Sequence, residues 1–211
     1  MIFKRRDRRA IGRIALDFVY PRGGWARAFE YVKLRVRRLP DTPEKISRGI
    51  WAGVFICFTP MFGLHFVFGA IIARLMRGNI LAALMATFFG NPITFPAIGY
   101  VSLKLGIWML DVPEDKVAGF GEKFAAASFD VWHNIRAIFT PDTFNWRGMQ
   151  VFYDDVFFPY LIGGILPGLV TATIAYYLSV PVIRAYQTRR KKILRAKLEQ
   201  LNKKPSSRDQ G

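Results

Sequence analysis

The feature that most constrains this chain is the length of its uncharged stretches. Residues 49–73, 78–103 and 156–183 contain no Asp, Glu, Lys or Arg. A helix needs about 20 apolar residues to cross the hydrocarbon core of a bilayer, and each of these stretches is longer than that. Soluble domains seldom contain three of them. The sequence therefore predicts an all-α integral membrane protein.

Charge is concentrated at the two ends of the chain. The sequence carries a formal net charge of +16, although 52% of its residues are hydrophobic. Residues 1–40 hold 12 basic against 3 acidic side chains, and residues 184–211 hold 10 against 2. Residues 41–183 are close to neutral, with 9 basic and 10 acidic side chains. Because Lys and Arg stay mainly on the cytoplasmic side of a membrane, both ends are expected to be cytoplasmic.

Residues 1–40 are interpreted as a basic interfacial arm of two amphipathic helices, broken at residues 20–24. In the second helix, apolar residues recur at spacings of three and four, which suits the headgroup layer of a membrane. These apolar positions are Trp25, Phe29, Val32, Val36 and Leu39. The candidate contacts to anionic lipid headgroups are Arg27, Lys33, Arg35, Arg37 and Arg38. Nucleic acid is the rival partner for such a segment, but the adjacent membrane stretches explain the charges without it.

The rest of the chain divides at its polar connections. We expect a membrane region with broken helices (41–110), an extracytoplasmic amphipathic loop (111–156), a final transmembrane helix (157–183) and a basic cytoplasmic tail (184–211). The loop carries 8 acidic and only 4 basic residues. Because basic residues favour the cytoplasmic side, this composition allows the loop to lie outside. Helical spacing of its apolar residues predicts an amphipathic helix, either on the far membrane surface or packed over the bundle. These residues are Val117, Phe120, Phe124, Val131, Ile135 and Ile138.

The link at residues 74–79 decides between two topologies. It contains Arg74 and Arg77 and no acidic residue, which favours the cytoplasmic side. In that case the first uncharged stretch enters the membrane and returns as a re-entrant hairpin, bent at Pro60 and Gly63. In the alternative topology all three stretches are full spans. That alternative places both the link and the basic tail outside, against the charge rule.

Polar residues and prolines interrupt two of the uncharged stretches. Pro60 with Gly63, and Pro92 with Pro96, are expected to break the helices that contain them. Paired interruptions of this kind are the best sequence indication of a transporter's binding site. The candidate substrate-binding residues are Thr59, Pro60, Gly63, His65, Asn79, Asn91, Pro92 and Thr94. The alternative is a structural role, in which Thr and Asn bond to local backbone or join helices.

No catalytic residue, metal site or cofactor is predicted, and we do not expect an enzyme. The two histidines, His65 and His133, belong to different segments, and no phosphate-binding glycine loop is present. Cys57 is the only cysteine, and a buried thiol is its expected state. Asp154 and Asp155 could bind a cation at the outer end of the third stretch, but a solvated pair is the ordinary outcome.

The sequence of residues 46–106 resembles a bacterial membrane domain of unknown function. That domain has the pattern G-x-x-x-G, then P-x-x-G-x-[HQ], A-x-x-x-R-x-N and N-P-x-T. The matching residues here are Gly49 and Gly53; Pro60, Gly63 and His65; Ala73, Arg77 and Asn79; and Asn91, Pro92 and Thr94. Gly163, Gly164, Pro167 and Gly168 look like the family's final helix. The resemblance implies a bacterial inner-membrane protein and brings no established activity.

Two functions follow as hypotheses. In the first, a multi-pass inner-membrane protein translocates a lipid or small solute through a polar site at its broken helices. In the second, a non-transporting scaffold binds anionic lipid and a protein partner. Because so small a chain would need a second copy to enclose a pathway, a homo-oligomer is expected. The spacing of Gly49 with Gly53, and of Gly164 with Gly168, would suit close packing within the chain or between copies.

Overall fold

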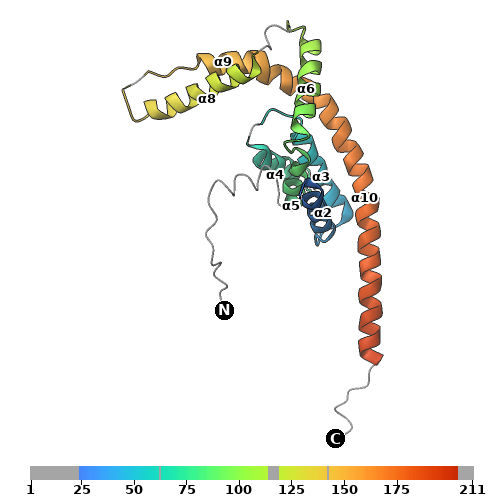
Figure 1. Cartoon of the computed structure of the whole chain (residues 1–211). Coiled ribbons are helices and arrows are strands. Elements are labelled where there is room, and N and C mark those ends of the chain that lie inside the picture. Colours follow the sequence, from blue (N-terminus) through green and yellow to red (C-terminus); the bar gives the residue numbers. More distant parts are fainter. Residues whose placement is uncertain (1–23, 62, 114–118, 142, 204–211) are drawn as a thin grey trace.

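The computed structural model describes residues 24–61, 63–113, 119–141 and 143–203, and this part of the chain is helical and contains no strand (Figure 1). The prediction of an all-α fold is confirmed. The elements are α2 (Gly24–Arg37), α3 (Pro43–Ile56), α4 (His65–Leu75), α5 (Ile80–Ala86), the 3₁₀ turn η1 (Thr87–Phe89), α6 (Phe95–Leu110), α8 (Phe120–Ala137), α9 (Arg147–Phe152), the π-helical turn η2 (Tyr153–Phe157) and α10 (Phe158–Lys203). The first helix expected in the basic arm lies outside the described residues.

Helix α10 is the longest element, and α3 and α6 pack along it (Figure 1). Helix α3 runs antiparallel to it: Ser179 Oγ donates to Ser47 Oγ at 2.8 Å, and Trp51 Nε1 donates to Thr173 Oγ1 at 3.2 Å. Helix α6 contacts the first turns of α10, where a Cβ added to Gly106 would collide with the backbone of Pro159. Glycine at such positions lets two helix backbones approach closely.

Helices α3 and α4 form a hairpin whose two ends meet. The backbone N–H of Asn79 donates to the carbonyl of Lys45 at 2.9 Å, and Arg48 Nη2 donates to the carbonyl of Arg77 at 3.2 Å. We call this end of the bundle the base; it comprises residues 41–48, 74–79 and 184–187. The first uncharged stretch is therefore two short helices, of 14 and 11 residues, and not one long helix.

The second uncharged stretch leads away from the base. Asn79 caps α5 by accepting a hydrogen bond from the N–H of Ala82 at 2.8 Å. The chain then continues through α5 and η1 to an interruption at residues 90–94, and on through α6 to the end opposite the base (Figure 1). The second uncharged stretch thus runs once along the bundle, from the base to the opposite end, as two helical segments separated at residues 90–94.

Helices α8 and α9 form an arm that extends sideways from the end opposite the base (Figure 1). The arm is held together by polar side chains: Asp130 Oδ2 accepts from the N–H groups of Gly148 and Met149 at 2.7 and 3.1 Å, and Asn134 exchanges two hydrogen bonds with the backbone of Asn145. Helix α8 therefore packs on α9. The apolar stripe predicted from spacing is exposed in its described members, which are Phe120, Phe124, Val131, Ile135 and Ile138. Val117 lies outside the described residues.

Much of the apolar surface of the bundle lacks cover by the protein. One continuous helix, Arg147–Gln200, is long and apolar enough to cross a membrane, and only 22% of its most apolar 18-residue window is buried. Helix α4, the segment Ile80–Phe89 and helix α6 are shorter apolar elements. Large exposed side chains on α4 and α10 include Val67, Ile71, Leu166, Val170, Ile174 and Leu178. So extensive an apolar belt is typical of a surface that meets lipid or another protein.

The glycine contacts give a direct test of this packing. An added Cβ at Gly53 of α3 would lie 2.7 Å from the Cβ of Ala86 and collide with the Ala83 carbonyl. We expect Gly53→Val to destabilise the protein by about 1–3 kcal/mol, the usual cost of overpacking. Thermal unfolding in detergent, followed by circular dichroism, measures the change.

The matched control is Gly121→Ala in α8, where an added Cβ meets nothing within 4 Å. This substitution should stabilise the helix by about 0.5–1 kcal/mol, because alanine is the better helix former. Similar melting temperatures for Gly53→Val and the wild type would contradict the observed contact between α3 and α5.

Candidate functional site

Two interruptions of the helices lie against each other halfway along the bundle. Residues 57–64 separate α3 from α4, and residues 90–94 separate η1 from α6. An added Cβ at Gly90 would lie 3.0 Å from Cys57 Sγ, and the rings of His65 and Phe95 are 5.4 Å apart. Cys57 also shares a buried cluster with Ala172, near the middle of the third uncharged stretch. The structure thus brings the two predicted breaks together.

At the first break, the polar groups bond to the local backbone. Thr59 is buried and its hydroxyl donates to the carbonyl of Ile56 at 2.8 Å. Pro60 is fully buried, whereas Gly63 is exposed and has a φ of +78°, a left-handed conformation that favours glycine. His65 Nε2 donates to the carbonyl of Thr59 at 3.2 Å, and the ring is partly exposed. His65 therefore closes the turn with one ring nitrogen.

At the second break, the side chains of Asn91 and Thr94 bond within the turn that precedes α6. Asn91 Oδ1 accepts from the N–H groups of Ile93 and Thr94 at 2.9 and 3.1 Å. In return, Thr94 Oγ1 accepts from the N–H of Asn91 at 3.0 Å and donates to the carbonyl of Phe89 at 2.5 Å. Pro92 follows Asn91 where a missing N–H costs least, as at the first position of a helix. These contacts favour a structural role for Asn91 and Thr94.

Four helix ends meet at the paired breaks. Helices α3 and η1 end here, and α4 and α6 begin with His65 and Phe95. The beginning of a helix carries a partial positive charge and unpaired N–H groups, and its end carries a partial negative charge. The two helix beginnings, beside the partly exposed His65 ring, are the part of this site best suited to an anionic group.

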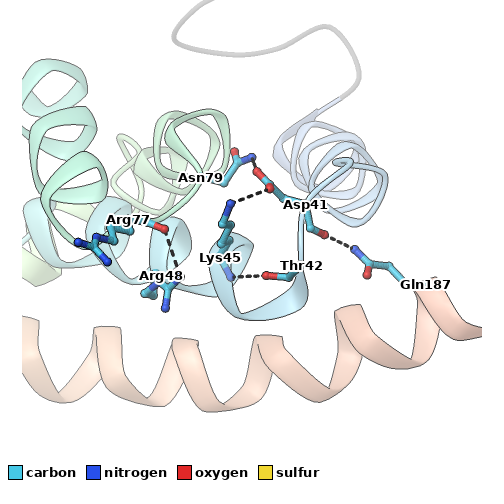
Figure 2. Close-up of polar contacts among 7 residues, drawn as sticks. All are labelled: Asp41, Thr42, Lys45, Arg48, Arg77, Asn79 and Gln187. Atoms are coloured by element: carbon cyan, nitrogen blue, oxygen red, sulfur yellow. Dashed lines mark hydrogen bonds and ion pairs between the residues drawn. The ribbon is translucent and has the colours of Figure 1, made fainter.

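Asn79 does not belong to this site. It lies at the base, at the opposite end of α5 from the second break, and its Nδ2 donates to Asp41 Oδ2 at 2.6 Å (Figure 2). Its two side-chain atoms are used for capping α5 and for holding the turn before α3. Among the candidate residues, Asn79 is the one that the fold separates from the others.

The basic arm also differs in part from the expectation. The apolar positions Val32, Val36 and Leu39 were expected to face lipid, but they pack against Ile46, Ala82 and Ile183 at the base. That prediction was wrong because the end of α2 packs its apolar side chains on the protein and not on lipid. The cations remain outside: Arg27, Lys33, Arg35 and Arg38 are exposed and Arg37 is partly exposed. The side chains of Trp25 and Phe29 lie outside the described part.

Sequence reasoning missed the polar network of the base (Figure 2). Asp41 accepts from Asn79 and lies 3.7 Å from Lys45 Nζ, while its carbonyl accepts from Gln187 Nε2 at 2.9 Å. Gln187 belongs to the basic tail, so no local pattern links it to Asp41. In the described part of the chain, no three His, Cys, Asp or Glu side chains gather as a metal-binding group.

The capping geometry predicts how Asn91 tolerates substitution. Asn91→Ala removes the acceptor for two backbone N–H groups and should destabilise the protein by about 0.5–2 kcal/mol. Asn91→Ser keeps an acceptor at a good capping position and should cost clearly less. Thermal unfolding of both variants in detergent measures the difference. Equal destabilisation by Ala and Ser would show that the cap is not what Asn91 contributes.

The comparisons with known proteins extend over most of the chain. Residues 26–192 match the family described as an uncharacterized protein conserved in bacteria, DUF2062. None of the curated proteins and none of the solved structures matches the sequence. The matched region includes α3 to α6, both breaks, the arm and most of α10. The chain therefore belongs to this uncharacterized bacterial family.

Proposed function

We propose that this protein is a multi-pass protein of the bacterial inner membrane, that its base faces the cytoplasm and that α3 and α4 form a re-entrant hairpin. The apolar belt on α4 and α10 supports burial in lipid, because its side chains have no cover in the described chain. The link at 74–79 in the base carries two arginines, and α2 and the later part of α10, which adjoin the base, carry further cations; this supports a cytoplasmic base under the charge rule.

The lengths of the helices fit this placement. At 1.5 Å per residue, the 14 residues of α3 and the 11 of α4 reach about 21 and 16 Å. Each is roughly half of, or somewhat more than half of, a hydrocarbon core of about 30 Å, as a re-entrant limb requires. The chain from α5 to α6 then crosses the membrane outward, and α10 returns to the cytoplasmic side. The arm lies at the outer surface.

In this placement, the paired breaks lie near the middle of the membrane, and we assign them the function of translocating a lipid or a small solute. The observation that carries the proposal is the contact between the two breaks, where α4 and α6 both begin next to His65. Discontinuous helices whose positive ends converge at mid-membrane are the usual way in which transporters bind a polar group.

A non-transporting scaffold is the second candidate. It is favoured by the hydrogen bonds of Asn91 and Thr94, which are used inside the second break and leave little for a substrate. In that case the exposed cations of the base would bind lipid, and the exposed aromatic residues of the arm would bind a protein partner.

Lipid movement provides the test. Full-length protein is reconstituted into vesicles that contain a fluorescent phosphatidylglycerol, and a membrane-impermeant reductant bleaches only the outer leaflet. Translocation predicts bleaching well beyond the half seen without protein. His65→Ala should slow this bleaching about tenfold or more, since it removes the polar ring at the breaks; a single lost interaction of 1.4 kcal/mol already gives tenfold.

His133→Ala is the matched control, because His133 Nε2 also donates to a backbone carbonyl, that of Thr143, at 3.1 Å, but in the arm. It should leave the bleaching rate unchanged. If His65→Ala and His133→Ala behave alike, the breaks are not the route. Wild-type vesicles that bleach like protein-free vesicles would contradict lipid translocation and favour the scaffold.

A further inference from the structure

The base holds three arginines at the foot of the α3–α4 hairpin. Arg48 belongs to α3, Arg74 to the last turn of α4, and Arg77 to the link that follows. Arg48 Nη2 donates to the carbonyl of Arg77 at 3.2 Å, and an added Cβ at Gly78 would lie 3.0 Å from the Cβ of Arg48. Arg48 is thus packed against the link, and Figure 2 shows its side chain beside the backbone carbonyl of Arg77.

The acidic groups of the base are engaged with other partners. Asp41 pairs with Lys45 and accepts from Asn79. Glu44 pairs with Arg184, whose hydrogen bond lowers the pKa of Glu44 below its usual value and so keeps this pair charged. In the described part of the chain, neither Arg48, Arg74 nor Arg77 has an acidic partner. The foot of the hairpin therefore carries uncompensated positive charge.

One donor at this foot is buried without an acceptor. Arg48 Nε is inaccessible and has no hydrogen-bond partner in the described structure. A buried donor of a charged group is costly to leave unpaired, and native proteins usually supply an acceptor. Arg74 and Arg77 are exposed beside it. Because the Arg48 nitrogen is inaccessible, an external anion would instead meet the exposed guanidinium groups of Arg74 and Arg77, and phosphate is an anion that guanidinium groups bind strongly.

The surroundings of the arginines are apolar. Leu75, between Arg74 and Arg77, is 78% exposed, and Ile80 and Leu81 at the start of α5 are 40% and 58% exposed. A soluble anion makes no use of exposed leucine and isoleucine, whereas a lipid places its phosphate beside its acyl chains. In the membrane placement proposed above, on which this argument depends, the foot lies where headgroups meet hydrocarbon on the cytoplasmic side.

We infer that the foot of the hairpin binds the phosphate headgroup of an anionic phospholipid of the cytoplasmic leaflet. Arg74 and Arg77 donate to the phosphate oxygens, Arg48 holds the link that carries Arg77, and Leu75 packs against the upper acyl chains. This site differs from the headgroup contacts expected along α2, and it fastens the two ends of the re-entrant hairpin to the membrane surface.

The experiment titrates purified full-length protein in neutral detergent with phosphatidylglycerol or phosphatidylcholine and follows the unfolding midpoint. Phosphatidylglycerol should raise the midpoint at lower concentration than phosphatidylcholine. The double variant Arg74→Gln with Arg77→Asn should need about 25-fold more phosphatidylglycerol for the same rise, since each of the two basic residues near an anionic surface contributes roughly fivefold. Asn is chosen because Arg77 has a φ of +52°, which Asn tolerates.

The matched control removes two cations from the arm, Arg136→Gln with Arg147→Gln, both exposed in the wild type. It should keep the wild-type titration. An equal loss in this control would make the effect one of total charge and would overturn the site. Unchanged phosphatidylglycerol binding by the base variant would overturn it as well. Inorganic phosphate that raises the midpoint as phosphatidylglycerol does would assign the arginines to a soluble anion and refute the lipid.

A third variant tests the lipid site even if the double variant Arg74→Gln with Arg77→Asn does not fold. Leu75→Ser leaves every charge in place and should still weaken phosphatidylglycerol binding, because it removes the apolar contact; an unchanged titration would contradict the lipid site. The titration needs no translocation. A protein that binds phosphatidylglycerol at the foot but moves no lipid would therefore contradict the transport proposal alone.

Discussion

In the proposed membrane placement, the structure depends on one constraint: backbone N–H and C=O groups freed at a helix break inside hydrocarbon must be satisfied by the protein itself. Both breaks meet this constraint locally. Thr59 Oγ1 and His65 Nε2 donate to the carbonyls of Ile56 and Thr59, and Asn91 Oδ1 accepts from the N–H groups of Ile93 and Thr94 just before α6. These bonds accompany the reversal of the chain at the first break and its continuation past the second.

Close approach of the backbones is the second requirement, and glycine provides it. Gly49 and Gly53 of α3 lie against α5, and Gly163 and Gly164 of α10 lie against α6 and the end of α3. These contacts hold the two breaks side by side and bring both ends of the hairpin to the base. The paired glycines are thus used within the chain, which accounts for their spacing without a second copy. The candidate site and the arginine foot are the two ends of the same hairpin.

The sequence predicted the features that are local, and missed those that join distant segments. The breaks at Pro60 and at Asn91 and the amphipathic helix α8 follow from neighbouring residues. By contrast, Gln187 bonds to Asp41 across most of the chain, and Asn79 was grouped with the breaks although it lies at the base. Hydrophobic spacing also did not distinguish packing of the end of α2 on protein from burial in lipid. An apolar stripe on a helix suits both environments equally.

The most direct test of the central claim is the side of the membrane on which the link at 74–79 lies. In a Cys57→Ser background, single cysteines replace Arg74, Ser128 and Thr188, all exposed in the wild type, and a membrane-impermeant thiol reagent is applied to intact and to opened cells. A re-entrant hairpin predicts labelling of position 128 alone in intact cells, and of positions 74 and 188 only after opening. Labelling of positions 74 and 188 but not 128 in intact cells would mean three full crossings and would contradict the account.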